Sequence, residues 1–467
     1  MLKPNADLTA PPKGHKVSHH KPAWKFMPML EYVNGLAHDF SGVFLTMVYK
    51  TLGASNAMVG LAAALQIPLA FNALWAPMVE RMGTYRMTMM RTLFAIILSI
   101  FALSGILYFI GTSYLLISAV FLGMIVLLSI FEITERGYKV SSLNAEEIAL
   151  YSGINVACYR IGLMTGSTLL IYLAGIMAER HGYHIAWGGI FALTGAALVL
   201  LWVYLKFVLP YPLVDKGEHV KLTPSSYGRI FVSFVRQQSG LTILLFLFLS
   251  RFGEGLCKYI EMPFCLDPPE LGGMGLNLKI LGVMSPFTMA SMVVAGIIGG
   301  ILVKVFKLHR VLFILMPLMF IPNIMYSYLA YSPHLEIHTY AVTFGGLLKE
   351  PWMFEANLWV LAAGVIENFG YGISFAPIVV MVDLISKNAG ENKATYGAIA
   401  GGILLLGFIM GGTLCGFTQE AVGYFWTYNL SVLISLPAWF LVPWLPLRQI
   451  EEQSSQIDQD AHLNGND

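Results

Sequence analysis

The stretch "LTILLFLFLSRFGEGLCKYIEMPFCLD", residues 241–267, joins a hydrocarbon-like run to a series of charged side chains. Spacings of three, four and three residues place four of them on one face of a helix: Arg251, Glu254, Lys258 and Glu261. The segment is long enough to cross the ~30 Å hydrocarbon core of a bilayer. Because an ionised group at the bilayer centre costs about 2.5–3.5 kcal/mol, these side chains are expected to face partners or an aqueous path.

The rest of the chain is equally apolar. Of its 467 residues 57% are hydrophobic and 12% are charged, and the mean hydropathy is +0.68. Soluble domains carry about 25% charged residues. Apolar segments of roughly 20 residues recur, and they predict an all-α polytopic membrane protein with about twelve transmembrane helices. The expected spans are 26–49, 58–78, 87–110, 114–135, 150–176, 187–209, 240–264, 279–303, 311–331, 357–386, 395–418 and 424–447.

A hydrophilic segment divides these spans into two groups of six. The predicted organisation is a basic cytoplasmic tail, an N-terminal six-helix half, a cytoplasmic central loop, a C-terminal six-helix half and a polar, acidic tail that we expect to be disordered. The limits are 1–25, 26–209, 210–239, 240–447 and 448–467. The first segment has no apolar core of the kind a cleaved signal peptide needs.

Lysine and arginine predict the orientation. With the N-terminus inside, nineteen of them fall in cytoplasmic segments and only four on the other side: Lys50, Arg180, Lys279 and Lys349. Positive charge accumulates on the cytoplasmic side of membrane proteins. Both termini are therefore expected in the cytoplasm. The net charge of +1 and the lack of a basic, aromatic-rich surface stretch give no support for nucleic-acid binding.

The loop after the second span, "ALWAPMVERMGTYR" (73–86), follows the loop signature of major facilitator transporters: a small residue, an acid, a base, then glycine and a base. These positions are Ala76, Glu80, Arg81, Gly83 and Arg86. The segment "GGILVKVFKLHR" (299–310) occupies the corresponding place in the second half. Such a loop can clamp neighbouring helix ends and release them when the halves move, although a basic loop that only sets orientation would look similar.

Four further stretches resemble a narrower group, the AmpG-like branch of peptide, acetyl-CoA and drug transporters in the major facilitator superfamily. They are "NALWAPMVER" (72–81), "ACYRIGLM" (157–164), the stretch around 249–282, and 365–386 with 393–407. The resemblance covers most of the spans. It implies two pseudo-symmetric six-helix halves with a site between them near the middle of the membrane.

The resemblance also implies a proton-coupled importer, a multi-pass protein of the bacterial inner membrane that acts as a monomer without a cofactor. Its solute would be anionic, such as an anhydromuropeptide or another peptide-sugar; a siderophore is the alternative. Asn72 stands where these permeases usually have a lysine, and Arg136 stands where a second acid is expected after Glu132. A membrane-embedded acyltransferase is a remote alternative, because only His38 and Asp39 would suit one.

Charged residues inside the spans are the candidates for the solute and proton pathway. Span seven contributes Arg251, Glu254 and Lys258. On a helix, Glu254 can reach both of these cations. The three side chains either line a cavity that binds solute and proton or only neutralise one another within the membrane. Span ten contributes Glu367 with Tyr371, an acid beside aromatic rings that suits stacking on a sugar or ring, or a packed aromatic girdle.

The first half supplies a second set of candidates. His38 and Asp39 are a possible proton relay, since histidine titrates near neutral pH. Glu31 lies near the cytoplasmic end. Arg160 is either the partner of Glu132 or a ligand for an anionic solute. The four cysteines are dispersed and the histidines of "HLEIH" (334–338) lack the glutamate of a zincin motif, so no metal site is expected.

Overall fold

A computed structural model describes residues 22–72, 79, 83–143, 145–211, 224–236, 239–342, 352–389 and 393–464. Within these ranges the chain is almost entirely helical. The N-terminal half begins with a short 3-10 turn, η1 (Ala23–Lys25). Its helices are α1 (Met27–Asp39), α2 (Val43–Thr51), α3 (Asn56–Ala63), α4 (Ile67–Ala70), α6 (Tyr85–Phe109), α7 (Tyr114–Ser142), α8 (Ala145–Met164) and α9 (Ile171–Val208). A 3-10 turn, η2 (Ala64–Gln66), joins α3 to α4, and a π-helical turn, η3 (Thr165–Leu170), joins α8 to α9.

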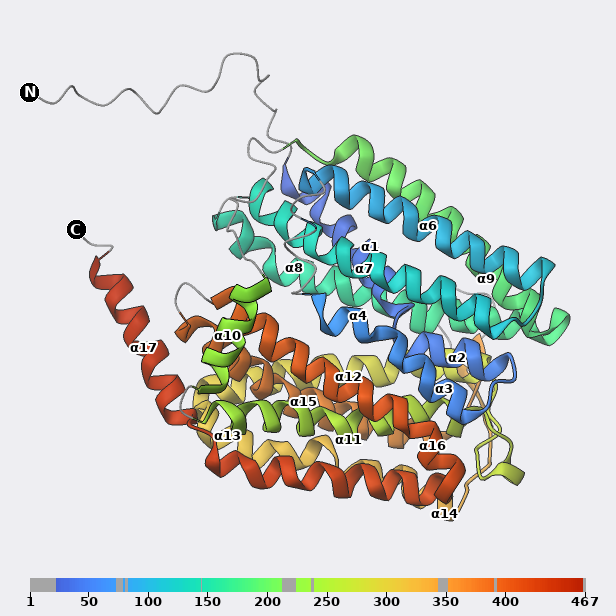
Figure 1. The fold of residues 1–467 in the computed structure, drawn as a ribbon. Helices are drawn as coiled ribbons and strands as arrows, with labels where there is room; N and C mark the ends of the chain where they lie inside the picture. Colours follow the sequence, from blue (N-terminus) through green and yellow to red (C-terminus); the bar gives the residue numbers. More distant parts are fainter. Residues whose placement is uncertain are drawn as a thin grey trace, which may run out of the picture.

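The C-terminal half is built in the same way. Its helices are α10 (Pro224–Arg236), α11 (Gly240–Leu266), α12 (Leu278–Phe306), α13 (Leu308–Leu315), α14 (Asn323–Tyr331), α15 (Leu358–Asn388), α16 (Lys393–Leu441) and α17 (Leu447–Asn464). The short turns are η4 (Pro269–Leu271), η5 (Met316–Met319) and η7 (Val442–Trp444). Figure 1 shows α1 to α9 gathered on one side of the bundle and α11 to α16 on the other, with most long helices running roughly parallel or antiparallel.

Eight helical segments are long and apolar enough to cross a membrane, judged by length and composition. Two of them, Ile154–Val208 and Thr395–Trp444, contain 55 and 50 residues, and each is interrupted at a glycine. Gly182 and Gly423 adopt φ of +79° and +78°, a left-handed conformation that only glycine adopts easily. Each segment therefore holds two of the predicted spans. With α1–α2 and α3–α4 as the first two spans, the structure confirms an all-helical polytopic membrane fold.

Three elements differ from the sequence prediction. The outer segment before α15 forms an antiparallel hairpin of β1 (His338–Val342) and β2 (Trp352–Ala356). Residues 224–236 of the predicted central loop form α10. The expected disorder of the C-terminal tail is wrong, because Leu447–Asn464 is the helix α17. Its Glu451 accepts a hydrogen bond from the backbone N–H of Leu308 at 2.7 Å and contacts His309 Nδ1 at 2.6 Å, which fastens α17 to the start of α13.

Glycines set the closest helix contacts, and they do so equivalently in the two halves. A Cβ added at Gly35 of α1 would lie 2.0 Å from the carbonyl oxygen of Tyr159 in α8. A Cβ added at Gly255 of α11 would lie 2.0 Å from the carbonyl oxygen of Phe408 in α16. Backbone therefore touches backbone at both crossings, as small residues allow in membrane helices. These crossings fix the positions of α1 and α11, which carry the charged side chains.

Replacing Gly255 by valine should destabilise the C-terminal half, because its added carbons would overlap the backbone of α16. Overpacking typically costs about 1–3 kcal/mol, and backbone cannot yield as a side chain can. We expect a lower melting temperature and less folded protein in mild detergent, measured by fluorescence-detected gel filtration. Gly300→Val on α12 is the control, since nothing lies within 4 Å of a Cβ at that position. Equal melting temperatures for the two variants would contradict the packing described.

Candidate functional site

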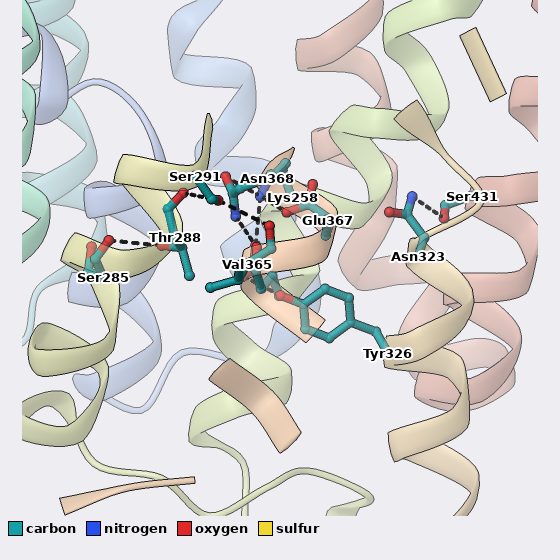
Figure 2. Close-up of polar contacts among 12 residues, drawn as sticks. Lys258, Ser285, Thr288, Ser291, Asn323, Tyr326, Val365, Glu367, Asn368 and Ser431 are labelled. Atoms are coloured by element: carbon teal, nitrogen blue, oxygen red, sulfur yellow. Dashed lines mark hydrogen bonds and ion pairs between the residues drawn. The ribbon is translucent and has the colours of Figure 1, made fainter. Parts of the chain in front are cut away.

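Buried charges of the C-terminal half meet around Lys258 of α11. Its ammonium group is in contact with Glu367 Oε2 on α15, and it lies 3.2 Å from Glu261 Oε2 and 3.3 Å from Asn368 Oδ1. Tyr326 of α14 donates a hydrogen bond to the other oxygen of Glu261 at 2.7 Å. Figure 2 shows Lys258 beside Glu367 and Asn368, with Tyr326 approaching from the neighbouring helix. We call Lys258, Glu261 and Glu367 the lysine cluster.

The lysine cluster corrects the picture drawn from the sequence. Glu254 was expected to reach Arg251 and Lys258 along the helix, but neither cation forms an ion pair with it among the described residues. Glu254 is 1% exposed, and both of its carboxylate oxygens are enclosed without a hydrogen-bond partner in the described ranges. The dominant pairing instead joins two helices, α11 and α15. Glu254 therefore lies near the lysine cluster without a direct ion pair to Lys258.

Arg251 lies two turns before Lys258 and is surrounded by rings. Its guanidinium carbon is 5.1 Å from the ring centre of Tyr371, 4.8 Å from that of Phe375 and 4.3 Å from that of Phe408. The rings of Tyr371 and Phe375, both from α15, stack at 5.2 Å. Arg251 Nε and Nη1 are enclosed and find no acceptor in the part of the chain that is described. The sequence places these aromatic rings beside Glu367, whereas the structure places them around Arg251.

A second ion pair lies in the N-terminal half. His38 Nδ1 of α1 is 2.8 Å from Glu132 Oε1 of α7, and the ring of Tyr159 lies 6.0 Å from that of His38. Asp39 has a different partner, because Ser167 Oγ of η3 donates a hydrogen bond to its Oδ1 at 2.5 Å. The structure thus brings His38 together with Glu132. It gives the neighbouring Asp39 a separate contact, so the two adjacent residues do not form a pair.

The interpretation of Arg160 as the partner of Glu132 is wrong, since the histidine occupies that place. Arg160 of α8 is half-buried, and it makes no ion pair with any described residue. Its alternative role, as a ligand for an anionic solute, stays a prediction. Glu31, near the start of α1, has partners near the end of α7: Lys139 Nζ lies 2.6 Å from Glu31 Oε1 and 2.8 Å from Glu135 Oε1. Glu31 is therefore held in a network and does not simply extend to the membrane surface.

The two ion pairs occupy equivalent places. "NGLAH" (34–38) in α1 corresponds to "EGLCK" (254–258) in α11, so His38 matches Lys258 and both follow the close-packed glycine by three residues. Each cation contacts a glutamate of the fourth span of its own half, Glu132 or Glu367. This short repeat was present in the sequence and could have matched His38 with Lys258. It does not reveal their acidic partners, which are 94 and 109 residues away.

A polar lock joins the two halves at the end of the bundle that carries the α2–α3 and α11–α12 connections. Lys50 Nζ of α2 lies 2.6 Å from Asp267 Oδ1, beyond the end of α11, and 2.6 Å from Asn56 Oδ1. Asn56 Nδ2 donates to Gln419 Oε1 at 2.7 Å and to the Tyr424 hydroxyl at 3.0 Å, and Tyr424 donates to Asp267 Oδ2 at 2.5 Å. We call Lys50, Asn56, Asp267, Gln419 and Tyr424 the outer lock.

The outer lock was not predicted, because its members lie at helix ends and carry no motif. Asn56, Asp267 and Tyr424 are nevertheless buried, with exposed fractions of 7%, 5% and 3%. Backbone also meets there: a Cβ at Gly416 of α16 would lie 1.6 Å from the carbonyl oxygen of Asn56. The halves are therefore tightly closed at this end.

The loop after the second span was predicted to clamp neighbouring helix ends. Its Glu80 and Arg81 lie outside the described residues. Gly83 has φ of +131°. Arg86 donates a hydrogen bond to the Lys206 carbonyl oxygen at 2.9 Å and stacks over the Tyr211 ring at 3.8 Å. Lys206 belongs to span six, and Tyr211 follows that span directly. The described contacts of Arg86 thus bind span three to the end of span six.

Comparisons with known proteins agree with this architecture. The family model described as Major Facilitator Superfamily matches residues 32–348. A "Putative transporter AmpG 2" of Rickettsia bellii (strain RML369-C) is 19% identical over 432 residues, 90% of this chain and 96% of the relative. The "Anhydromuropeptide permease" of Escherichia coli (strain K12) is 24% identical over 315 residues, 67% of this chain and 56% of the permease. The crystal structure of the nucleoside transporter NupG superimposes with a TM-score of 0.62 at 11% identity, covering 89% of this chain and 97% of that one.

Lys258→Met should destabilise the protein strongly, because Glu367, which is fully buried, would lose its cation. Breaking a buried pair by removing one partner costs about 3–5 kcal/mol. Adding Glu367→Gln should recover much of this loss in melting temperature. Lys279→Met is the matched control: it removes a pair with Glu179 at 3.6 Å whose side chains are 38% and 51% exposed, which is worth about 0–1 kcal/mol. A double variant no more stable than Lys258→Met would argue against the pairing.

Proposed function

The chain belongs to the Major Facilitator Superfamily, and we propose that it imports an anionic solute by alternating access, driven by protons. The solute class we propose is an anhydromuropeptide or a related peptide-sugar, in line with the names of its AmpG-like relatives. The protein is a multi-pass membrane protein. We further propose that it acts as a monomer in the bacterial inner membrane with both termini in the cytoplasm, which the distribution of lysine and arginine supports.

The observation that carries this proposal is the charge balance around Lys258. Three buried carboxylates, Glu254, Glu261 and Glu367, accompany two cations, Lys258 and Arg251. If all were ionised, the group would hold one uncompensated negative charge inside the membrane, and burying such a charge is costly. One proton therefore belongs to the group at rest. Glu254, whose two oxygens lack partners among the described residues, is the carboxyl group we assign to it.

This assignment explains how a proton and an anion would travel together. Arg251 and Glu254 are one helical turn apart, so an ionised Glu254 attracts the guanidinium and competes with any anionic solute. A protonated Glu254 leaves Arg251 available. The anionic solute then pairs with Arg251, and the proton on Glu254 is carried through the conformational change together with the solute. Differential binding of this kind is what links a solute to a conformational equilibrium.

Glu254→Gln should abolish accumulation driven by a pH gradient, because glutamine cannot release the proton, while exchange of solute for solute continues. The measurement uses proteoliposomes with an alkaline interior and radiolabelled anhydromuropeptide, with ferric siderophore complexes as the competing solute class. Wild-type accumulation should collapse on adding a protonophore. Accumulation by Glu254→Gln at the wild-type level would remove this residue from coupling, and wild-type uptake of the siderophore alone would replace the proposed solute.

Alternating access also predicts a role for the outer lock. Asp267→Asn would leave Lys50, whose side chain is only 12% exposed, without its counter-charge, so the closed outer end should lose stability. Native Cys265 and Cys415 are 2% and 0% exposed at this end and serve as reporters. Their labelling by an impermeant thiol reagent added outside intact cells should accelerate about tenfold, which corresponds to a shift of about 1.4 kcal/mol.

Peptide mapping by mass spectrometry would locate the label on each cysteine. Glu336→Gln is the control for that experiment, because it changes only an exposed pair with His338 at 3.6 Å. Unchanged labelling of Cys265 and Cys415 in Asp267→Asn would show that the lock does not hold the outer end closed. Labelling from the cytoplasmic side alone would reverse the proposed orientation.

A further inference from the structure

Arg251 is a buried cation that finds no acceptor among the residues that the structure describes. The side chain is 7% exposed, and Nε and Nη1 are fully enclosed with no hydrogen-bond partner among the described residues. A guanidinium has five N–H donors, and leaving buried donors unpaired costs about 1–3 kcal/mol, more for charged groups. Each of the three cation–π contacts returns about 0.5–2 kcal/mol, but a ring face supplies no acceptor in the plane of the enclosed N–H donors. These donors therefore remain unpaired within the described residues.

The N-terminal half provides an internal comparison. By the correspondence of "NGLAH" with "EGLCK", Arg251 occupies the place that Glu31 occupies in α1. Glu31 is neutralised across the helices by Lys139 of α7 at 2.6 Å. At the same level α15 offers Arg251 the rings of Tyr371 and Phe375 and no carboxylate. At this level Glu31 of the N-terminal half has a direct ion pair, and Arg251 of the C-terminal half has none among the described residues.

We propose that Arg251, with the rings of Tyr371, Phe375 and Phe408, forms a subsite for an anionic group carried next to a sugar or other ring. This inference rests on the proposed transport function and specifies how the solute is recognised. The planar fork of arginine fits a carboxylate or phosphate with two parallel hydrogen bonds. The rings, all partly exposed, offer a face on which an adjoining ring of the solute can lie.

The charged groups around the subsite are consistent with an anion. On α11 they are Glu254, which the proton neutralises, and Lys258, whose charge is matched within the lysine cluster. α15 contributes Glu367, already in contact with Lys258. α16 presents Phe408 and carries no charged residue between Tyr396 and Gln419. An incoming carboxylate would therefore meet a guanidinium that no carboxylate contacts directly among the described residues.

The test compares solutes that differ only in charge. Uptake of anhydromuropeptide and of the same compound with amidated carboxylates is measured for the wild type, Arg251→Gln, Arg251→Lys and, as a control on the exposed surface of α17, Arg448→Gln. We expect the KM of Arg251→Gln for the anionic solute to rise about tenfold or more, as for a lost charge-assisted contact, with kcat less affected. The KM for the amidated solute should stay near the wild-type value, and lysine should restore only part of the affinity.

A binding measurement separates this inference from the proposed function. The melting temperature of the purified protein is followed with N-acetylmuramic acid, which has a carboxylate, and with N-acetylglucosamine, which has none. The acid alone should stabilise the wild type, and Arg251→Gln should abolish the shift. If the wild type transports anhydromuropeptide and Arg251→Gln has an unchanged KM, the subsite is wrong and the function stands. If no transport occurs but the acid shifts the wild type through Arg251, the subsite stands and the function falls. If the wild type neither transports anhydromuropeptide nor is stabilised by N-acetylmuramic acid, both the subsite and the proposed function are wrong.

Discussion

A bilayer offers no water to buried polar groups, so every charge within the spans must find its partner inside the protein. The lysine cluster meets this requirement for Lys258, Glu261 and Glu367. Lys258 can remain buried only because Glu367 and Glu261 come from two helices to meet it, and Tyr326 satisfies a further oxygen of Glu261. The position of α15 against α11 therefore depends on this contact, and the close approach at Gly255 fixes α16 against α11.

The same scaffold is used twice with different side chains. Gly35 and Gly255 set equivalent crossings, and His38–Glu132 and Lys258–Glu367 are equivalent ion pairs. The difference is chemical: histidine gains and loses a proton near neutral pH in water, whereas lysine stays charged. Repetition thus supplies the architecture, and substitution at a few matched positions gives each half its own electrostatic character. The largest of these differences is at the matched positions of Arg251 in α11 and Glu31 in α1, where the sign of the charge is reversed.

Sequence alone predicted the spans well because hydrophobic length is a local property. It placed breaks near Gly182 and Gly423, where positive-φ glycines interrupt the long helices. It failed where tertiary contacts decide. Glu254 and Lys258 are neighbours on a helix face, yet the lysine contacts Glu367, which is 109 residues away. For Arg160, pairing with Glu132 was one of two interpretations left open, and His38 holds that position. The polar tail was expected to be disordered, but Glu451 anchors α17 by capping the start of α13.

Contacts between the halves at the outer end of the bundle are of two kinds. Gly416 of α16 lies against the backbone of Asn56, as Gly35 and Gly255 lie against backbone within each half. The side-chain hydrogen bonds of the outer lock around Asp267 accompany this contact, at an end of the bundle where water can replace each partner when it opens. If the two end states differ by only a few kcal/mol, the binding of a solute and a proton that we propose would be enough to reverse their order. Polar contacts that water can replace at one end of the bundle are what the proposed alternating access requires.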